Sequence, residues 1–334
     1  MTELIQKSIN TQTKFRDTIS KYESFMNSVE SIGLRIYDIA KKLKYSEAEL
    51  LSTQLGTKLK YLKINNAFDF FNEIKKLKKV MFLTRNNDVV HEKIVICKKL
   101  DYINGRNFVI RYNKEPLVLF NENLWAHVFS EHRVQRNKDL RSIQLFNSGG
   151  NAILKIYLKS NCIEQFNKII AKYEVPYNYE LQSDLETSSN KIDDNLLKLA
   201  MSSIKWNQTV PSKVYIKKNI TSKGLLKRIL QYIAKNNLDL GIYILGFSSI
   251  QYFEGKIHKL VDYKDWFNIL DPEFNLQIKA SILEKNIKIQ YTKGHYNLFH
   301  ITFADSTQNS ILGLYSLGGN SYQISDMLQL HKGT

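Results

Sequence analysis

The sequence predicts an α+β fold made by internal duplication, and three observations indicate it. Helix-like segments precede clusters of strand-like segments in each half of the chain, which is typical of α+β proteins rather than of a wound parallel sheet. Pieces of sequence recur at one fixed spacing. The length of 334 residues exceeds the roughly 100–200 residues of a usual single domain.

The duplication shows in two pairs of segments. Ser142–Tyr157 is matched by His300–Tyr315, and Phe108–Asn113 is matched by Trp266–Asp271, both at a spacing of 158 residues. A shared offset at two separated places is what two copies of one module would leave in a sequence.

The individual elements follow from periodicity. The recurring segments alternate apolar and polar residues and turn at clusters such as Asn147–Asn151, so we expect antiparallel strands joined by hairpins. Ser46 and Glu49 predict a capping box at the start of one helix. Helical periods occupy Ile32–Leu43, Glu47–Leu55, Ala67–Lys76, Ile163–Tyr173, Leu196–Ile204 and Leu225–Lys235.

The repeats are expected at residues 1–181 and 196–334. The stretch 182–195 between them contains four acidic residues and no aromatic one, so it is the expected linker.

The composition is that of a folded globular protein, with 43% hydrophobic residues and 17 Phe, 19 Tyr and 3 Trp. Apolar runs such as Ile242–Phe247 are far shorter than the roughly 20 residues that cross a bilayer, so no membrane insertion is expected. The two cysteines, Cys97 and Cys162, lack zinc-ligand spacing, which favours a reduced cytoplasm and no structural zinc.

The net charge of +16 suggests an anionic partner, but the predominance of lysine over arginine weakens the case for nucleic acid. Lysines number 39 and arginines nine, whereas groove contacts favour the bidentate guanidinium. Residues Leu34–Gly56 could form a helix-turn-helix, yet its second helix opens with Glu47 and Glu49, where phosphates would crowd. A packing element is favoured over a nucleic-acid interface.

Catalytic motifs are missing from the sequence. The seven histidines have no paired-ligand spacing, and no nucleophile elbow, phosphate loop or HExxH motif is present. We therefore assign no catalytic residue, and any enzymatic chemistry would come from a cofactor.

A series of motifs runs in unbroken order from about residue 30 to 317. They are Ile36–Ala40, Ser46–Leu50, Leu83–Asn86, Val90–Lys93, Trp125, Val128, Phe129, Arg141–Gln144 and Phe146, then Gln251–Gly255, Trp266, Asn268, Pro272, Leu314 and Tyr315. This series resembles the HemS-type haemin-degrading factors, which are bacterial cytoplasmic haem-utilisation proteins built from two homologous repeats.

The resemblance implies two large, stacked antiparallel sheets flanked by helices, and a b-type haem held in the second half. It also implies a haem importer or a haem-receiving protein as partner. Haem needs an aromatic, apolar slot with cationic or hydroxyl donors for its propionates. In the family, the position of Tyr315 helps to hold a propionate. Phe253 and Trp266 match family aromatics near the pocket, and sheet core explains them equally well.

The axial-ligand position departs from the family. The stretch Ala200–Trp206 places Lys205 in the slot of the family's histidine, and Met201 lies in the same stretch. A lysine amine must lose its proton to bind iron, which is costly at an unperturbed pKa of about 10.4 unless the amine is buried. His295, His300 or a tyrosine are the alternative ligands.

The chain also differs from the family at two positions where the family has arginine. Its distal arginine falls at Val118 or Leu119, and its C-terminal propionate-binding arginine falls near Gly318. Without a donor to organise oxygen, degradation would suffer before binding. We therefore expect an intracellular haem carrier or reservoir, with haem degradation less supported. The alternatives are a nucleic-acid-binding protein using residues 34–56 and a fold that has lost haem binding.

Overall fold

The structure is a computed structural model that describes residues 2–103, 108–121, 125–135, 137–176, 216–284, 287–293, 299–304 and 310–317. Its contacts divide the chain into two units, Met1–Val80 with Glu122–Asn190, and Met81–Asn121 with Lys191–Thr334. The expected linker and the helix expected at Leu196–Ile204 lie outside the described residues, so the boundaries of the repeats stay a prediction.

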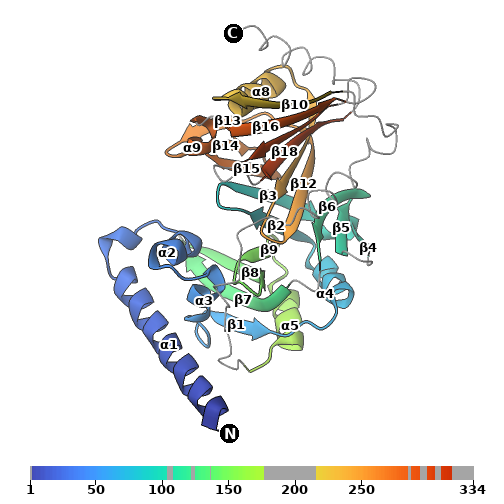
Figure 1. The fold of residues 1–334 in the computed structure, drawn as a ribbon. Helices are drawn as coiled ribbons and strands as arrows, with labels where there is room; N and C mark the ends of the chain where they lie inside the picture. Colours follow the sequence, from blue (N-terminus) through green and yellow to red (C-terminus); the bar gives the residue numbers. More distant parts are fainter. Residues whose placement is uncertain are drawn as a thin grey trace. The chain divides into compact units, whose positions relative to one another are not determined.

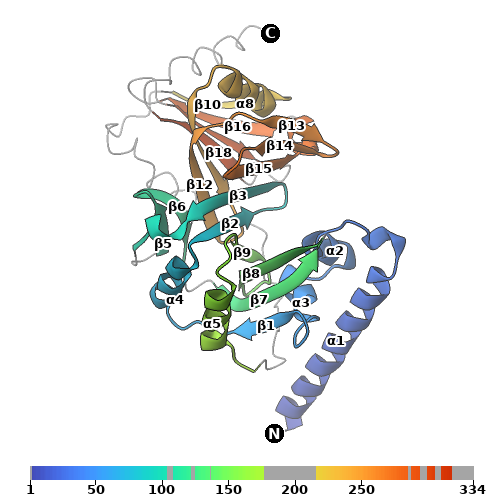
Figure 2. The same cartoon turned by 180° about the vertical axis from the view of Figure 1, so that it is seen from behind.

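The first unit combines five helices with four antiparallel strands among its described residues (Figures 1 and 2). The helices are α1 (Thr2–Met26), α2 (Ile36–Leu43), α3 (Glu47–Ser52), α4 (Ala67–Ile74) and α5 (Ile163–Tyr173), with 3-10 turns at Val29–Ser31 and Lys75–Leu77. The strands are β1 (Leu59–Leu62), β7 (Trp125–Gln135), β8 (Lys138–Asn147) and β9 (Ala152–Leu158). Their order in the sheet is β1-β7-β8-β9.

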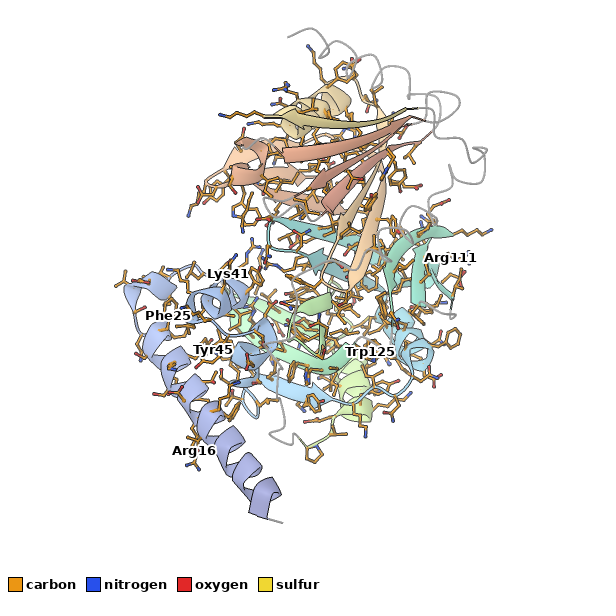
Figure 3. The ribbon with its side chains drawn as sticks, in the orientation of Figure 1. Arg16, Phe25, Lys41, Tyr45, Arg111 and Trp125 are labelled. Carbon is orange, nitrogen blue, oxygen red and sulfur yellow. The ribbon has the colours of Figure 1, made fainter. Side chains whose placement is uncertain are left out.

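The helix signals in the sequence are confirmed in this unit, although α1 was not expected. Ser46 Oγ accepts from the Glu49 backbone N–H at 3.2 Å, and Glu49 Oε2 accepts from the Ser46 N–H at 2.9 Å, which completes the capping box. The C-terminal end of α1 packs through Phe25 beside Tyr45, against the cluster formed by α2 and α3 (Figure 3).

The second unit holds most strands of the chain. Its described elements are β2 (Lys79–Arg85), which begins at the unit boundary, β3 (Val89–Ile96), a 3-10 turn (Cys97–Lys99), β4 (Leu100–Ile103), β5 (Phe108–Tyr112), β6 (Glu115–Phe120), β10 (Ile216–Ser222), α8 (Leu225–Lys235), β11 (Asp239–Leu245), β12 (Ser249–Lys256), β13 (Leu260–Tyr263), β14 (Trp266–Leu270), β15 (Phe274–Lys279), α9 (Ala280–Glu284), β16 (Ile287–Lys293), β17 (Phe299–Ala304) and β18 (Ser310–Ser316). One sheet has the order β10-β16-β17-β18-β11-β12-β6-β5-β4, and β2-β3-β15-β14-β13 lie in the other.

These strand orders confirm the duplicated α+β fold. The order β10-β16-β17-β18 repeats β1-β7-β8-β9 of the first unit. The two copies also exchange a three-stranded meander. Strand β6 of the first copy pairs with β12 of the second, and β15 of the second pairs with β3 of the first.

The two sheets of the second unit stack on a shared core, as expected. Ile242 and Ile244 of β11 and Leu276 and Ile278 of β15 belong to one buried cluster, together with Ile229 of α8. Each of these side chains is at most 1% exposed. One face of β11 is therefore committed to the core, and the opposite face carries a different set of side chains.

Candidate functional site

Four aromatic side chains share the face of the second unit's sheet that points away from this core. They are Tyr243 of β11, Tyr252 of β12, His300 of β17 and Tyr315 of β18, and we call them the aromatic face. Side chains alternate along a strand, so Ile242 points into the core while Tyr243 points to the aromatic face. All four are at most 2% exposed.

Glycines let two of these rings lie flat on the sheet. The Tyr243 ring crosses Gly313 of β18, where an added Cβ would lie 2.1 Å from Tyr243 Cζ. The Tyr315 ring crosses Gly241 of β11 in the opposite direction, again with a Cβ position 2.1 Å from the ring. Any larger residue at either glycine would push the ring off the sheet, so the two glycines make the surface flat.

Hydrogen bonds fix the orientation of the rings. The Tyr243 hydroxyl lies 2.6 Å from His300 Nε2, and the planes of the two rings are almost parallel, at 10°. The Tyr315 hydroxyl donates to Glu254 Oε1 at 2.8 Å. These contacts hold a broad aromatic surface over four strands.

Burial keeps the four side chains of the aromatic face uncharged at neutral pH. It lowers the pKa of His300 to about 4, so the imidazole is neutral. Burial also raises the pKa of Tyr243. The pKa of Tyr315 is raised well above its usual value by burial and, after that, by the charge of Glu254. Such a surface suits an apolar ligand better than a polar one.

The exchanged meander places β6 beside this face. Leu119 pairs with Ile250, which shares the strand face of Tyr252, whereas Val118 pairs with Gln251 on the other side. Both β6 residues are at most 1% exposed. The two positions that align with the family's distal arginine are therefore buried and apolar.

The structure brings together only some of the residues predicted from sequence. Tyr315 and His300 lie in the aromatic face. Phe253 lies on the opposite side of the same sheet, in the core, and stacks on Phe274 with ring centroids 3.7 Å apart. Trp266 lies on β14, with the Lys279 amine 6.0 Å from its ring centroid. The other predicted site residues, namely Lys205, Met201 and His295, fall outside the described residues.

Sequence reasoning missed Tyr243 and Tyr252. A signal was present, because Gly241-Ile242-Tyr243 and Gly313-Leu314-Tyr315 are the same Gly-x-Tyr pattern on two neighbouring strands. In antiparallel strands this pattern sets each tyrosine opposite the glycine of its neighbour, at Tyr243↔Gly313 and Gly241↔Tyr315.

Three further features limit the alternatives. All six residues of α3 are buried, so the helix that would enter a DNA groove is packed away. Within the described residues, no group of three or more His, Cys, Asp or Glu side chains could hold a metal ion. No helix in that part of the chain is long and apolar enough to cross a membrane.

Comparison with known proteins shows which family this chain resembles. Residues 44–173 match the model of the haemin-degrading HemS/ChuX domain family. Together with the duplicated fold, this match confirms the expected resemblance to HemS/ChuS-type proteins.

Individual relatives cover nearly the whole chain. The hemin transport protein HmuS of Yersinia pestis is 24% identical over 314 residues, which span 86% of this chain and 90% of HmuS. The haem-degrading enzyme ChuS of Escherichia coli O157:H7 has a TM-score of 0.73 at 18% identity, covering 91% of this chain and 94% of ChuS. Holo-PhuS, a haem-binding protein of Pseudomonas aeruginosa, has a TM-score of 0.72 at 20% identity, with 91% and 94% covered. None of these comparisons supports nucleic-acid binding.

Proposed function

We propose that this chain is an intracellular haem-binding protein of haem and iron utilisation, acting as a carrier or reservoir. The observation that carries the proposal is the flat, buried, uncharged aromatic face in the second copy of a HemS-type fold. Relatives that transport hemin or bind haem support the choice of ligand. A haem importer or a haem-receiving protein is the partner we expect.

The residues of the aromatic face fit a b-type haem. A porphyrin is planar and mostly apolar, and it stacks well on rings that lie parallel to a sheet. The Tyr315 hydroxyl can serve a propionate if it leaves Glu254, its present acceptor. When bound, haem supplies an iron that takes axial ligands and can undergo redox chemistry.

Lys205 remains our proposed axial ligand, with Met201 and His295 as alternatives. The duplication supports Lys205. The N-cap residues of α4 and α8, Asn66 and Gly224, are 158 residues apart, so the repeat spacing also holds for the helices. The same spacing makes Lys205 the equivalent of Glu47 in the first repeat. Glu47 contacts Lys155 on β9, and Lys155 is the equivalent of Gly313 beneath Tyr243. The equivalent residue of the first copy thus reaches the matching face of its own sheet.

Carriage is better supported than degradation. Oxidative opening of haem benefits from a donor that organises bound oxygen. The β6 positions that could carry it hold Val118 and Leu119, neither of which has a polar side chain. The chain is therefore proposed to bind haem without a built-in distal cation at this position.

Titration of the purified protein with haemin tests binding. A saturable change in the Soret absorption that ends at one equivalent is expected, and no saturable change would defeat the proposal. Lys205→Ala should move the Soret maximum and weaken binding at least tenfold. Lys256→Ala, at an exposed position of β12, should leave both unchanged.

A second measurement separates carriage from degradation. Haem-loaded protein given a reductant and oxygen, with catalase present, should keep its Soret band. Loss of the band at a catalytic rate would show an enzyme instead.

A further inference from the structure

The first repeat has its own version of the aromatic face, with different chemistry. Counting back 158 residues from His300, Thr302, Gly313 and Tyr315 leads to Ser142, Gln144, Lys155 and Tyr157. Their registers agree, since Ser142 pairs with Tyr157 and Gln144 with Lys155, as His300 pairs with Tyr315 and Thr302 with Gly313. The two faces are therefore equivalent in position.

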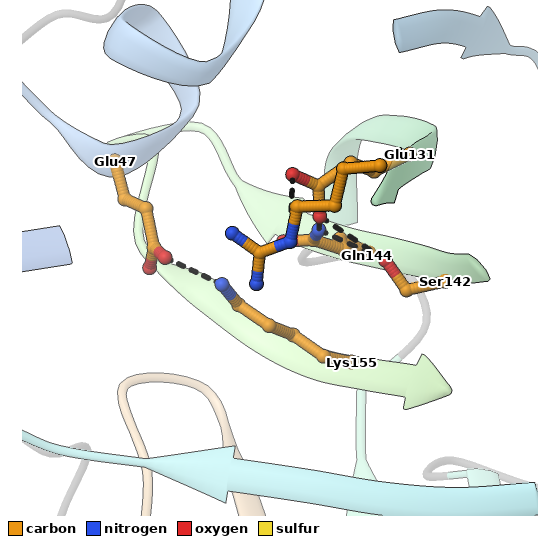
Figure 4. Close-up of polar contacts among 6 residues, drawn as sticks. Glu47, Glu131, Ser142, Gln144 and Lys155 are labelled. Carbon is orange, nitrogen blue, oxygen red and sulfur yellow. Dashed lines mark hydrogen bonds and ion pairs between the residues drawn. The ribbon is translucent and has the colours of Figure 1, made fainter. Parts of the chain in front are cut away.

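Lys155 stands where the second repeat has a glycine. Its amine lies 2.5 Å from Glu47 Oε1 of α3, and the two side chains are only 7% and 3% exposed (Figure 4). The amine is also 5.8 Å from the ring centroid of Phe146. In the second repeat the Tyr243 ring lies over Gly313, whereas in the first repeat the Lys155 side chain takes that position and forms a buried ion pair.

Further polar contacts fill the same face. Glu131 Oε2 accepts from Gln144 Nε2 at 2.8 Å and from Ser142 Oγ at 3.5 Å, and its other oxygen lies 3.6 Å from Arg133 Nε (Figure 4). Gln144 and Ser142 are each 1% exposed. A planar apolar ligand laid on this face would have to displace these contacts.

Helix α3 lies directly on the face. Ala48 and Leu51 pack with Phe129 and Phe146 of the sheet in one buried cluster. The Ala48 N–H donates to the Gly150 carbonyl at 3.0 Å, which ties the start of α3 to the β8–β9 turn. The first repeat thus closes its face with its own helix.

We infer that the Glu47–Lys155 pair closes the first repeat to planar ligands and confines haem to the second repeat, so that Lys155 is a specificity-determining residue. The nature of the ligand rests on the proposed function, whereas the closure rests on the contacts of the first unit. Opening the face would leave two opposite charges unpaired in a buried place, which is strongly unfavourable.

Amine acylation followed by mass spectrometry tests the closure without haem. Lys155 should react at least 100-fold more slowly than Lys60, whose side chain is 55% exposed although it also pairs with a carboxylate. The protection should be the same in haem-free and haemin-treated protein. Reaction of Lys155 at the rate of Lys60 in either state would overturn the inference.

Haemin titration tests the confinement. The wild type should bind one equivalent, whereas the double variant Glu47→Leu/Lys155→Gly, which removes both charges and restores the glycine of the second repeat, should bind a second equivalent. Two equivalents for the wild type, or only one for the folded double variant, would overturn the inference. A wild type that binds no haem but protects Lys155 would defeat the proposed function and leave the closure standing.

Discussion

Acid should destabilise this protein in a pH range where ordinary carboxylates are still ionised, because two histidines are buried in neutral form. Burial, and after it the charge of Lys93, lowers the pKa of His91 to about 3. Burial lowers the pKa of His300 to about 4. His91 is fully buried against Phe274, and neither of its ring nitrogens has a hydrogen-bond partner among the described residues.

The sign and size follow from proton linkage. In the unfolded chain a histidine has a pKa of about 6.5, so between that value and the folded pKa the unfolded state binds the proton and the folded state does not. Stability is therefore intact above about pH 6.5 and falls as the pH drops. At pH 5 each histidine contributes a loss of about 2 kcal/mol, or about 4 kcal/mol together, against a usual total of roughly 5–15 kcal/mol.

Urea unfolding of haem-free protein between pH 7.5 and 5 measures this loss. His91→Gln should remove about half of the slope. Glutamine is the residue at the equivalent register position of the second repeat, because His91 pairs with Leu276 and Gln251 pairs with Val118, which lies 158 residues before Leu276. A His91→Gln variant with the full wild-type slope would refute the reasoning.

Two further predictions concern stability. Lys155→Met leaves Glu47 buried without a partner and should cost about 3–5 kcal/mol in urea unfolding, whereas Lys60→Met breaks an exposed pair and should cost about 0–1 kcal/mol. Equal costs would mean that burial of the Lys155 pair is energetically unimportant. Gly313→Ala pushes a Cβ into the Tyr243 ring, so it should lower stability by about 1–3 kcal/mol and weaken haemin binding. Unchanged haemin affinity in a folded Gly313→Ala protein would show that the aromatic face is not part of the haem site.

Local features were predictable from the sequence because they depend on neighbouring residues. The capping box needs only Ser46 and Glu49, and the periods at Ile163–Tyr173 and Leu225–Lys235 match α5 and α8 to the residue. The 158-residue spacing was visible because strands with the same burial pattern keep the same residue types. Helix α1 was missed since its polar sequence has only a weak apolar stripe.

Features that depend on distant partners were not predictable. The alternating pattern of β6 predicts a strand, but it does not tell which sheet edge the strand joins, and its partner β12 follows more than a hundred residues later. Phe253 and Tyr252 are adjacent aromatics, and only the register decides that Phe253 enters the core while Tyr252 joins the aromatic face. Lys205, Met201 and His295 remain predictions.

The exchange of meanders has a consequence for each half of the chain taken alone. A polypeptide that began at residue 196 would lack β4 to β6 and would leave the edge of β12 with unpaired N–H and C=O groups, and its own meander would lose β3. Such edges recruit strands from other molecules and promote aggregation. Two modules that have traded strands in this way each leave a sheet edge of the other unpaired when one of them is removed.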